Sequence, residues 1–288
     1  MKFSIIIPVL NRVNVISRAL DSACNQKFDS YEVLVIDNGS QDGTPEKVES
    51  NYPEVKIFHE ELKGVGAARN KGIAESRGDW IVILDSDNEF STENSLTDLD
   101  RLIKGKKNLD LLFTSNVDQN RNYVSFAKDF DSFQNISDFV NSGGEFSICA
   151  KRTWYQSNNH ILVPNVIHEL GLITYLKAVQ KATLFISSAV VQIYHTDSLN
   201  RVSSIKKSRN QMYDLSIYFI LSLSGYYRDI NFRIFWIWSL KLAIYSKLSN
   251  VHIDLKKEFW LTNLIKLLLI FIPKHVIRKI FDEKVNLS

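Results

Sequence analysis

Short apolar runs alternate with segments of helical spacing over the first 90 residues of the chain. Because helices of this length separate the strands, parallel pairing with right-handed crossovers is expected. Ligands of such folds bind beyond the carboxyl ends of the strands. The pattern predicts strands over 3–8, 31–36, 55–58 and 80–84, and helices over 13–26, 45–50 and 66–76.

Beyond residue 105 the pattern is more mixed. It predicts strands over 109–114 and 146–150, a helix over 168–178, and a strand pair over 183–187 and 190–194. Three helices follow, over 205–224, 230–248 and 255–281, the last interrupted at Pro273. We therefore expect an α/β domain over 1–202 and a helical region over 203–288.

The C-terminal region combines aromatic and basic residues. Its longest apolar run, Leu267 to Ile272, is bracketed by Lys266 and Pro273, whereas a membrane-spanning helix needs about 20 mostly apolar residues. The pattern is typical of amphipathic helices that lie on a membrane surface. Packing of these helices on the first domain or on another subunit explains the pattern as well.

Composition and charge separate the two regions further. The chain has 288 residues, 45% of them hydrophobic and 23% charged, which predicts a folded protein. Residues 201–288 contain 15 Lys and Arg against 6 Asp and Glu, whereas residues 1–200 contain 20 against 26. The acidic part suits a metal ion and the basic part suits anionic lipids or phosphates, unless its charges only keep the helices soluble. No nucleic-acid-binding motif accompanies the basic part.

Cysteine use and the first residues bear on location. Cys24 and Cys149 form no C-x-x-C motif, so neither a zinc site nor a disulfide framework is expected. The apolar stretch before Pro8 is too short for the core of a signal peptide. Both features favour a cytoplasmic location.

Polar side chains follow three of the predicted strands and so meet at one edge of the sheet. They are Asn11, the segment 37–40 (Asp-Asn-Gly-Ser) and the segment 85–88 (Asp-Ser-Asp-Asn). Two carboxylates in an Asp-x-Asp loop suit Mn²⁺ or Mg²⁺, which keeps positions open for substrate phosphates. Taken alone, aspartates are also common turn and capping residues. The glycine-rich segment 64–70 is no P-loop, since no Gly-Lys-Ser/Thr follows.

Four ordered segments resemble the family 2 glycosyltransferases of GT-A fold: 4–11 (SIIIPVLN), 35–44 (VIDNGSQDGT), 66–72 (GAARNKG) and 80–88 (WIVILDSDN). The resemblance thins beyond residue 90 and does not reach the C-terminal helices. It implies a Rossmann-like, mixed, mostly parallel sheet flanked by helices. It also implies an inverting transfer of sugar from a nucleotide-diphosphate donor, with UDP favoured, to an acceptor hydroxyl.

The resemblance also implies a role for each matching position. Donor binding falls to Pro8, Val9, Asn11, Asp37, Arg69, Asp85, Ser86 and Asp87. Within this set Asp37 would hold the base, Arg69 would lie near the base or the phosphates, and Asp87 would bind the divalent metal. Asn38 and Asn88 stand where the family often has Asp, so each keeps an acceptor oxygen and loses a charge.

Three further roles lie later in the chain. Glu169, at the start of the predicted helix where the family often has Glu-Asp, is the expected general base, although it could serve only as a helix cap. His195 is a candidate second metal ligand, and a lone histidine is equally often structural. Lys206 and Arg209 are candidate contacts to the diphosphate.

Two rival interpretations stay open at this point. A sugar nucleotidyltransferase would normally carry a glycine-rich basic loop after its first strand, where this chain has Pro8 to Arg12. A catalytically inactive GT-A-like protein that binds or scaffolds at a membrane is compatible with Asn38 and Asn88.

Enzymes that resemble family 2 glycosyltransferases usually assemble cell-surface polysaccharide or lipopolysaccharide. A glycan or lipid-linked acceptor at the cytoplasmic face of the inner membrane is therefore expected.

Overall fold

The computed structural model describes residues 1–124, 131–134, 146–160, 162, 182–195 and 243–244. The chain divides into two compact units, Met1–Arg201 and Val202–Ser288. The predicted helix over 168–178 and the three predicted C-terminal helices lie outside the described residues, apart from 243–244. Glu169, Lys206 and Arg209 lie outside them too.

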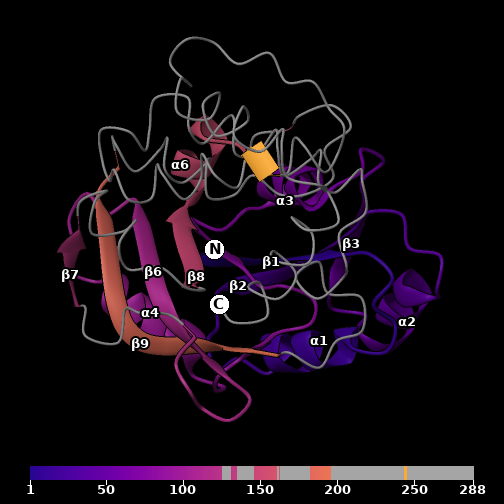
Figure 1. Ribbon diagram of the computed structural model, residues 1–288, viewed down its shortest axis with the longest axis horizontal. Helices are drawn as coiled ribbons and strands as arrows, with labels where there is room; N and C mark the ends of the chain where they lie inside the picture. The colour runs from indigo at the N-terminus through magenta and orange to yellow at the C-terminus, as the bar shows by residue number, and fades with distance from the viewer. Residues whose placement is uncertain (125–130, 135–145, 161, 163–181, 196–242, 245–288) are drawn as a thin grey trace. The chain divides into compact units, whose positions relative to one another are not determined.

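The first half of the sheet forms as the pattern predicts (Figure 1). Its strands are β1 (Phe3–Val9), β2 (Tyr31–Asp37), β3 (Lys56–His59) and β4 (Trp80–Ile83). Its helices are α1 (Ile16–Cys24), α2 (Thr44–Asn51) and α3 (Val65–Glu75). The strands lie in the order β3-β2-β1-β4 and pair in parallel, which confirms the predicted topology of this half.

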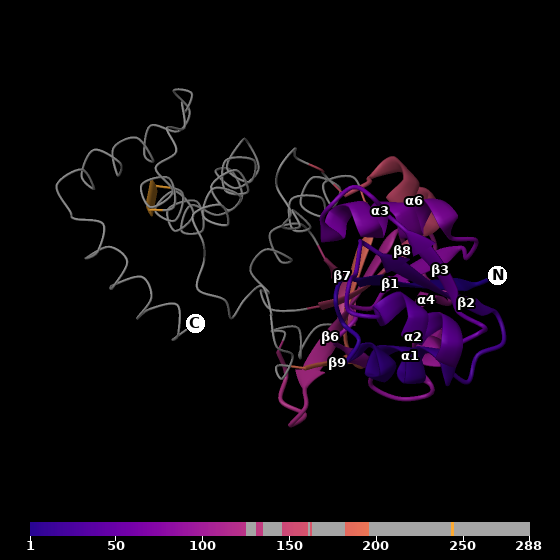
Figure 2. The same ribbon diagram turned by 90° about the vertical axis from the view of Figure 1, so that its right-hand side faces the viewer.

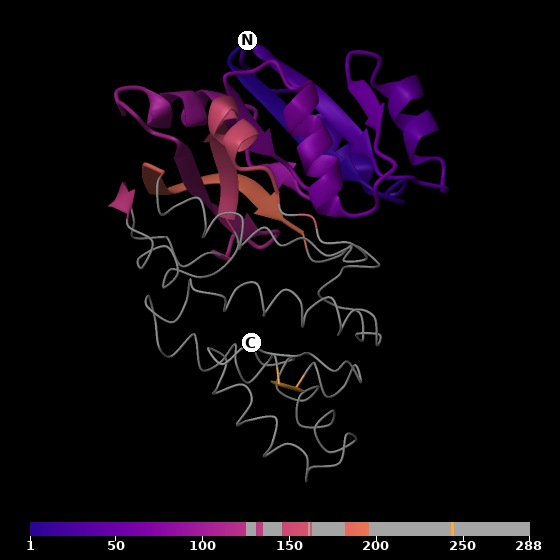
Figure 3. The ribbon, with the colours of Figure 1, turned by 90° about the horizontal axis from the view of Figure 1, so that it is seen from above.

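The second half makes the sheet mixed. Its elements are β5 (Glu89–Phe90), α4 (Ser95–Ile103), β6 (Leu111–Asp118), β7 (Asp131–Gln134), β8 (Phe146–Lys151), α6 (Arg152–Ser157) and β9 (Leu184–Tyr194). The order continues from β4 through β8, β6 and β9 to β5, with β7 also on β9. Strand β8 is antiparallel to both its neighbours, whereas β6 and β9 are parallel. The indigo strands of the first half and the magenta and orange strands of the second lie side by side in Figure 3.

The predicted strand pair over 183–187 and 190–194 is wrong, because these residues form the single strand β9. Its register against β6 shifts twice, between Thr114 and Asn116, so a bulge absorbs the extra residues. The hydroxyl groups of Ser187 and Ser188 each donate a 2.6 Å hydrogen bond to the Asp131 carboxylate of β7. A serine-rich stretch that resembles a turn is therefore held inside a strand by a neighbouring strand.

Helices cover both faces of the sheet. Figure 2 shows α3 and α6 on one face and α1, α2 and α4 on the other. All seven residues of β1 are buried, as expected of a central strand with apolar side chains on both faces. Helix α1 buries Ile16, Ala19, Leu20 and Ala23, at the spacing that predicted it.

Helix α3 approaches the sheet closely through small residues. A Cβ atom at Gly72 would lie 2.5 Å from Cγ2 of Ile6 in β1, so only glycine fits at this position. The buried side of α3 is completed by Gly66, Ala67, Ala68 and Ile73. The glycine and alanine of this segment thus set how near the helix, and with it Arg69, lies to the carboxyl edge of the sheet.

Within the part of the chain that the structure describes, no helix has the length and apolar character required to cross a membrane.

Candidate active site

Three loops meet at the carboxyl edge of the parallel strands. Val9 at the end of β1 pairs with Asp37 at the end of β2, and the main-chain nitrogen of Leu84 after β4 donates to the oxygen of Ile6 in β1. The end of β1, with Pro8, therefore lies between Asp37 and the Asp-x-Asp loop. The structure confirms that these predicted segments share one edge of the sheet.

The loops after β1 and β2 brace each other. Asn11 adopts a left-handed backbone conformation, with φ of 53°. Its main-chain nitrogen donates to Oγ of Ser40 at 2.9 Å, and its Oδ1 accepts from the nitrogen of Gln41 at 2.8 Å. The main-chain nitrogen of Val13 adds a hydrogen bond to Asp42. Asn11 was expected to bind the donor, but its side-chain oxygen already accepts a hydrogen bond that shapes the loop.

Asp37 is buried at the base of the same loop. Its carboxylate accepts hydrogen bonds from the main-chain nitrogens of Gly39 and Ser40, and Nδ1 of the exposed His59 lies 3.4 Å from its Oδ2. Asp37 therefore shapes the turn after β2. Its expected contact to a nucleotide base stays a prediction, and His59, which the sequence did not single out, lies beside it.

Asn38 positions the start of α3. Its amide nitrogen donates to the main-chain oxygens of Glu60 and Leu62 at 3.0 and 2.8 Å, and its Oδ1 accepts from the nitrogen of Gly64 at 2.7 Å. A carboxylate cannot donate, so aspartate would lose two of these three hydrogen bonds. The departure from the family pattern at position 38 is explained by this contact to the loop that leads into α3.

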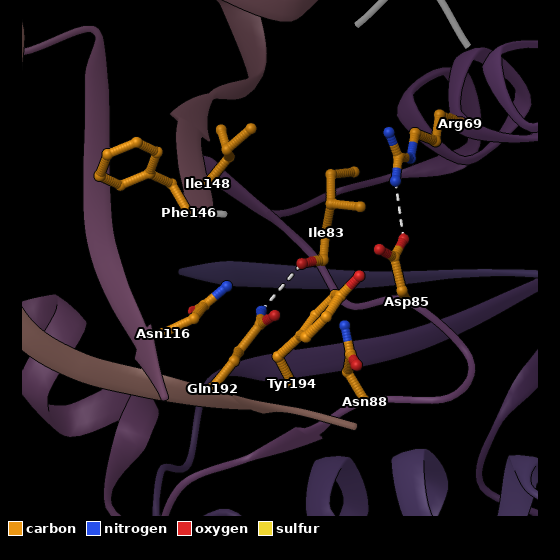
Figure 4. Close-up of a pocket in the computed structure, with 9 residues that line it drawn as sticks. All are labelled: Arg69, Ile83, Asp85, Asn88, Asn116, Phe146, Ile148, Gln192 and Tyr194. Atoms are coloured by element: carbon orange, nitrogen blue, oxygen red, sulfur yellow. Dashed lines mark hydrogen bonds and ion pairs between the residues drawn. The ribbon is translucent and has the colours of Figure 1, made fainter. Parts of the chain in front are cut away.

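Arg69 of α3 and Asp85 form an ion pair at the centre of the edge. Nη2 of Arg69 lies 2.7 Å from Oδ1 of Asp85, and the two side chains are 13% and 46% exposed (Figure 4). Because the Asp85 side chain is nearly half exposed, this ion pair stabilises the fold little.

The ion pair lies at the edge of a pocket of about 380 Å³, open solvent at its mouth included. Amides line one part of the pocket, and an apolar wall lines the rest. The amides are Asn88, Asn116 and Gln192; the wall is Ile83, Phe146, Ile148 and Tyr194. Of the predicted donor-binding residues the structure brings only Arg69 and Asp85 into this pocket, whereas Pro8, Val9, Asn11, Asp37, Ser86 and Asp87 do not line it.

The rest of the Asp-x-Asp loop is partly buried. The main-chain oxygen of Asp87 accepts a 3.3 Å hydrogen bond from Nη1 of Arg18 in α1, which ties the loop to that helix. Ser86 is buried. Among the described residues no three His, Cys, Asp or Glu side chains gather as a metal site, so two carboxylates are the most that this loop offers.

His195 lies just beyond β9 and next to Glu89. Its Nε2 is 2.9 Å from Oε1 of Glu89, and its main-chain nitrogen donates to Oδ1 of Asn88 at 3.1 Å. The imidazole is thus oriented by a carboxylate that sequence analysis missed, although Glu89 directly follows the Asp-x-Asp motif. His195 as a metal ligand stays a prediction.

The pocket residues of the second half-sheet were not predicted from the sequence. Asn116 and Gln192 are buried polar residues in β6 and β9. A buried amide in a strand requires a specific partner or ligand, so this pattern was the available signal. Phe146, Ile148 and Tyr194 carried no such signal, because apolar and aromatic residues are ordinary in strands.

His160 couples α3 to the segment after α6. Its main-chain nitrogen donates to Oδ1 of Asn70 at 2.8 Å, and its ring stacks on Tyr155 with centroids 5.8 Å apart. Burial, reinforced by the charge of Arg69, lowers the pKa of His160 to about 3. The imidazole is therefore neutral at pH 7.

This lowered pKa predicts acid sensitivity. The unfolded chain binds a proton at His160 near pH 6.5 and the folded chain only near 3, so the free energy of unfolding falls as the pH drops through this window. We expect this residue to cost about 2 kcal/mol between pH 7 and pH 5. Urea titrations at the two pH values measure the loss, which His160→Phe should reduce. Equal losses in the wild type and in His160→Phe would contradict the assignment.

A mixed α/β sheet with helices on both faces and a polar site at the carboxyl edge is the arrangement of GT-A glycosyltransferases. The family model of glycosyl transferase family 2 matches residues 4–150, half of the chain. The chain belongs to this family.

Individual relatives are similar over shorter stretches. The putative glycosyltransferase EpsH of Bacillus subtilis is 38% identical over 88 residues, which are 29% of this chain and 25% of EpsH. This chain covers only 13 to 25% of the length of the first curated relatives that it matches. These matches support membership of the family. The activity of the whole protein is a proposal.

Two solved structures share the fold. S. aureus TarS 1-349 in complex with UDP-GlcNAc has a TM-score of 0.64 and 19% identity, over 85% of this chain and 71% of that chain. The mannosyltransferase PcManGT from Pyrobaculum calidifontis, in complex with GDP-Man and Mn²⁺, has a TM-score of 0.56 and 15% identity, over 96% and 83%. At these identities the likeness establishes the fold alone.

Proposed function

We propose that this protein is a glycosyltransferase that transfers a sugar from a nucleotide-diphosphate donor, UDP-sugar in the first place, to an acceptor hydroxyl with inversion at the anomeric carbon. The observation that carries the proposal is the Arg69–Asp85 pair, held at 2.7 Å where a polar pocket meets the loop after β4. This arrangement offers a cationic side chain and carboxylates at the edge where the loops after β1, β2 and β4 converge.

Donor binding follows from the geometry of this edge. The braced loops after β1 and β2 present Pro8 and Val9 beside Asp37, where a nucleoside would bind. The guanidinium of Arg69 offers donors to phosphate oxygens. Because the loops are held by their own hydrogen bonds before any ligand arrives, binding orders little additional chain.

The donor set fits a divalent metal ion of the Mg²⁺ or Mn²⁺ kind. Asp85 and Asp87 supply hard carboxylate oxygens from one short loop, and such ions complete their coordination with phosphate oxygens and water. Asp87 would be the principal ligand, and His195 would join it if its ring turned away from Glu89. A bound ion would neutralise the charge on the leaving diphosphate.

Three assignments rest on the sequence. Glu169 would take the proton from the acceptor hydroxyl as it attacks, so no covalent enzyme intermediate is needed. Lys206 and Arg209 would contact the diphosphate. The setting would be the assembly of surface polysaccharide or lipopolysaccharide at the cytoplasmic face of the inner membrane, with the helices over 203–288 in peripheral contact with lipid or with a protein partner.

A ligand screen tests the proposal. Thermal unfolding is followed with UDP-, GDP- and dTDP-sugars, each with and without Mn²⁺. A ligand that binds only the folded protein raises Tm. At one hundred times its Kd it adds about 2.7 kcal/mol to the free energy of unfolding. We expect one nucleotide series to raise Tm and Mn²⁺ to increase the effect. If no sugar nucleotide shifted Tm at millimolar concentration, the proposal would be wrong.

A further inference from the structure

The pocket beside Arg69 and Asp85 contains three amide side chains, each with one end already fixed. Nε2 of Gln192 donates to the main-chain oxygen of Ile83 at 2.9 Å, and Oδ1 of Asn88 accepts from the nitrogen of His195 at 3.1 Å. Oδ1 of Asn116 accepts from the hydroxyl of Ser147. In Gln192 and Asn88 the main-chain partners determine which amide atom is nitrogen and which is oxygen, because a carbonyl only accepts and an N–H only donates. The hydroxyl of Ser147 can donate or accept, so it does not determine this for Asn116.

The opposite ends of these amides have no hydrogen-bond partner within the part of the chain that the structure describes. They are Nδ2 of Asn88, Nδ2 of Asn116 and Oε1 of Gln192. The three residues are only 3–4% exposed. Because these residues line the pocket, a ligand or water there can satisfy the amide ends. The pocket thus offers a donor at Asn88, an acceptor at Gln192 and one end of the Asn116 amide.

The other walls of the pocket narrow the choice of ligand. Phe146, Ile148 and Tyr194 present apolar surface that suits the C–H face of a sugar ring. Among the described residues that line it, the charged side chains are Arg69 and Asp85, which pair with each other. In the proposed complex Arg69 and the metal ion would face the diphosphate, so a carboxylate on the sugar would have no further cation to balance it among the described residues that line the pocket.

We propose that this pocket binds the transferred sugar of the donor, that this sugar is uncharged, and that Asn88, Asn116 and Gln192 select it by hydrogen bonds to its hydroxyl groups. This inference rests on the proposed function and adds the class of sugar and the residues that recognise it. Asn88, one of the departures from the family pattern, is then a specificity residue. Its amide supplies a donor that an aspartate lacks.

Two substitutions test this without removing the contacts that hold the amides in place. Asn88→Asp and Asn116→Asp each keep the acceptor oxygen and replace the donor nitrogen by a second oxygen. Asn94→Asp, at an exposed position before α4, makes the same chemical change outside the pocket and is the matched control. Circular dichroism and Tm confirm folding, and failure of one pocket variant to fold leaves the other for the test.

Calorimetry then measures Kd for UDP, for UDP-glucose, UDP-galactose and UDP-N-acetylglucosamine, and for UDP-glucuronate. GDP with GDP-mannose, and dTDP with dTDP-glucose, extend the panel. For the best-bound neutral conjugate we expect the ratio of its affinity to that of the bare nucleotide to fall about tenfold in each pocket variant. The ratio should not change in Asn94→Asp. UDP-glucuronate should bind the wild type at least about tenfold more weakly than the best neutral UDP-sugar.

The outcomes separate the two proposals. An unchanged ratio in both folded pocket variants, or a uronate as the best-bound conjugate, would overturn the sugar assignment while nucleotide-sugar binding stood. Wild-type protein that bound no nucleotide and no conjugate would overturn the proposed function, and this inference with it.

Discussion

Asp87→Ala should lower kcat/KM for sugar transfer about 1000-fold, which corresponds to about 4 kcal/mol of transition-state stabilisation. The expected reason is loss of the carboxylate that holds the divalent ion against the leaving diphosphate. Arg18 is bound to the main-chain oxygen of Asp87, a contact that the substitution keeps and that helps to hold the loop in place.

The measurement is transfer at increasing Mn²⁺ concentration in the wild type, in Asp87→Ala and in Asp29→Ala, a control at an exposed aspartate. Asp29→Ala should titrate with Mn²⁺ as the wild type does. In Asp87→Ala the residual activity should show little dependence on Mn²⁺, and Mn²⁺ should no longer improve donor binding. A wild-type Mn²⁺ titration curve in Asp87→Ala would remove this residue from the metal site.

Glu169→Gln should separate binding from chemistry. Glutamine keeps the size of the side chain and cannot accept the proton of the acceptor hydroxyl, so we expect transfer to fall by about 100- to 10,000-fold. Donor binding, followed by the same rise in Tm that detects the sugar nucleotide, should stay within about twofold of the wild type, because the base acts on the acceptor.

The matched control is Glu49→Gln on the exposed side of α2, which should transfer normally. The acidic limb of the pH profile of kcat/KM gives an independent readout, because it should report the base and disappear in Glu169→Gln. Normal turnover by Glu169→Gln would assign the base elsewhere, and loss of donor binding together with transfer would point to a structural role.

Much of the first half of the fold was predictable because its signals are local. The apolar runs of β1 and β4 and the small residues of α3 carry their own periodicity and close packing. The end of a helix is less local. Helix α1 was expected from residue 13 and begins at Ile16; the main-chain nitrogen of Val13, just before it, donates to Asp42 in the loop after β2.

The candidate site likewise has a part that could be predicted from the sequence and a part that could not. Asp37 and Asp85 were placed at one edge because parallel strands that follow one another present their carboxyl ends together. The residues that contact Asp37 and Asp85 were not predictable. His59 and Arg69 lie on other elements, and the alternation of polar and apolar residues does not show which elements lie beside the two aspartates. The role of Asn38 as a donor to Glu60 and Leu62 likewise depends on a contact across more than 20 residues.

The sequence by itself determined the strand–helix order of the first 90 residues, the family resemblance and the edge of the sheet that carries the candidate site. Each of these depends on residues that are close together in the chain. Only the tertiary structure decided that β9 is one bulged strand and that Asn88, Asn116 and Gln192 share a pocket with Arg69 and Asp85. Those residues come together through the pairing of β4, β8, β6 and β9, an order that differs from their order in the chain. Local periodicity does not specify which distant strands become neighbours.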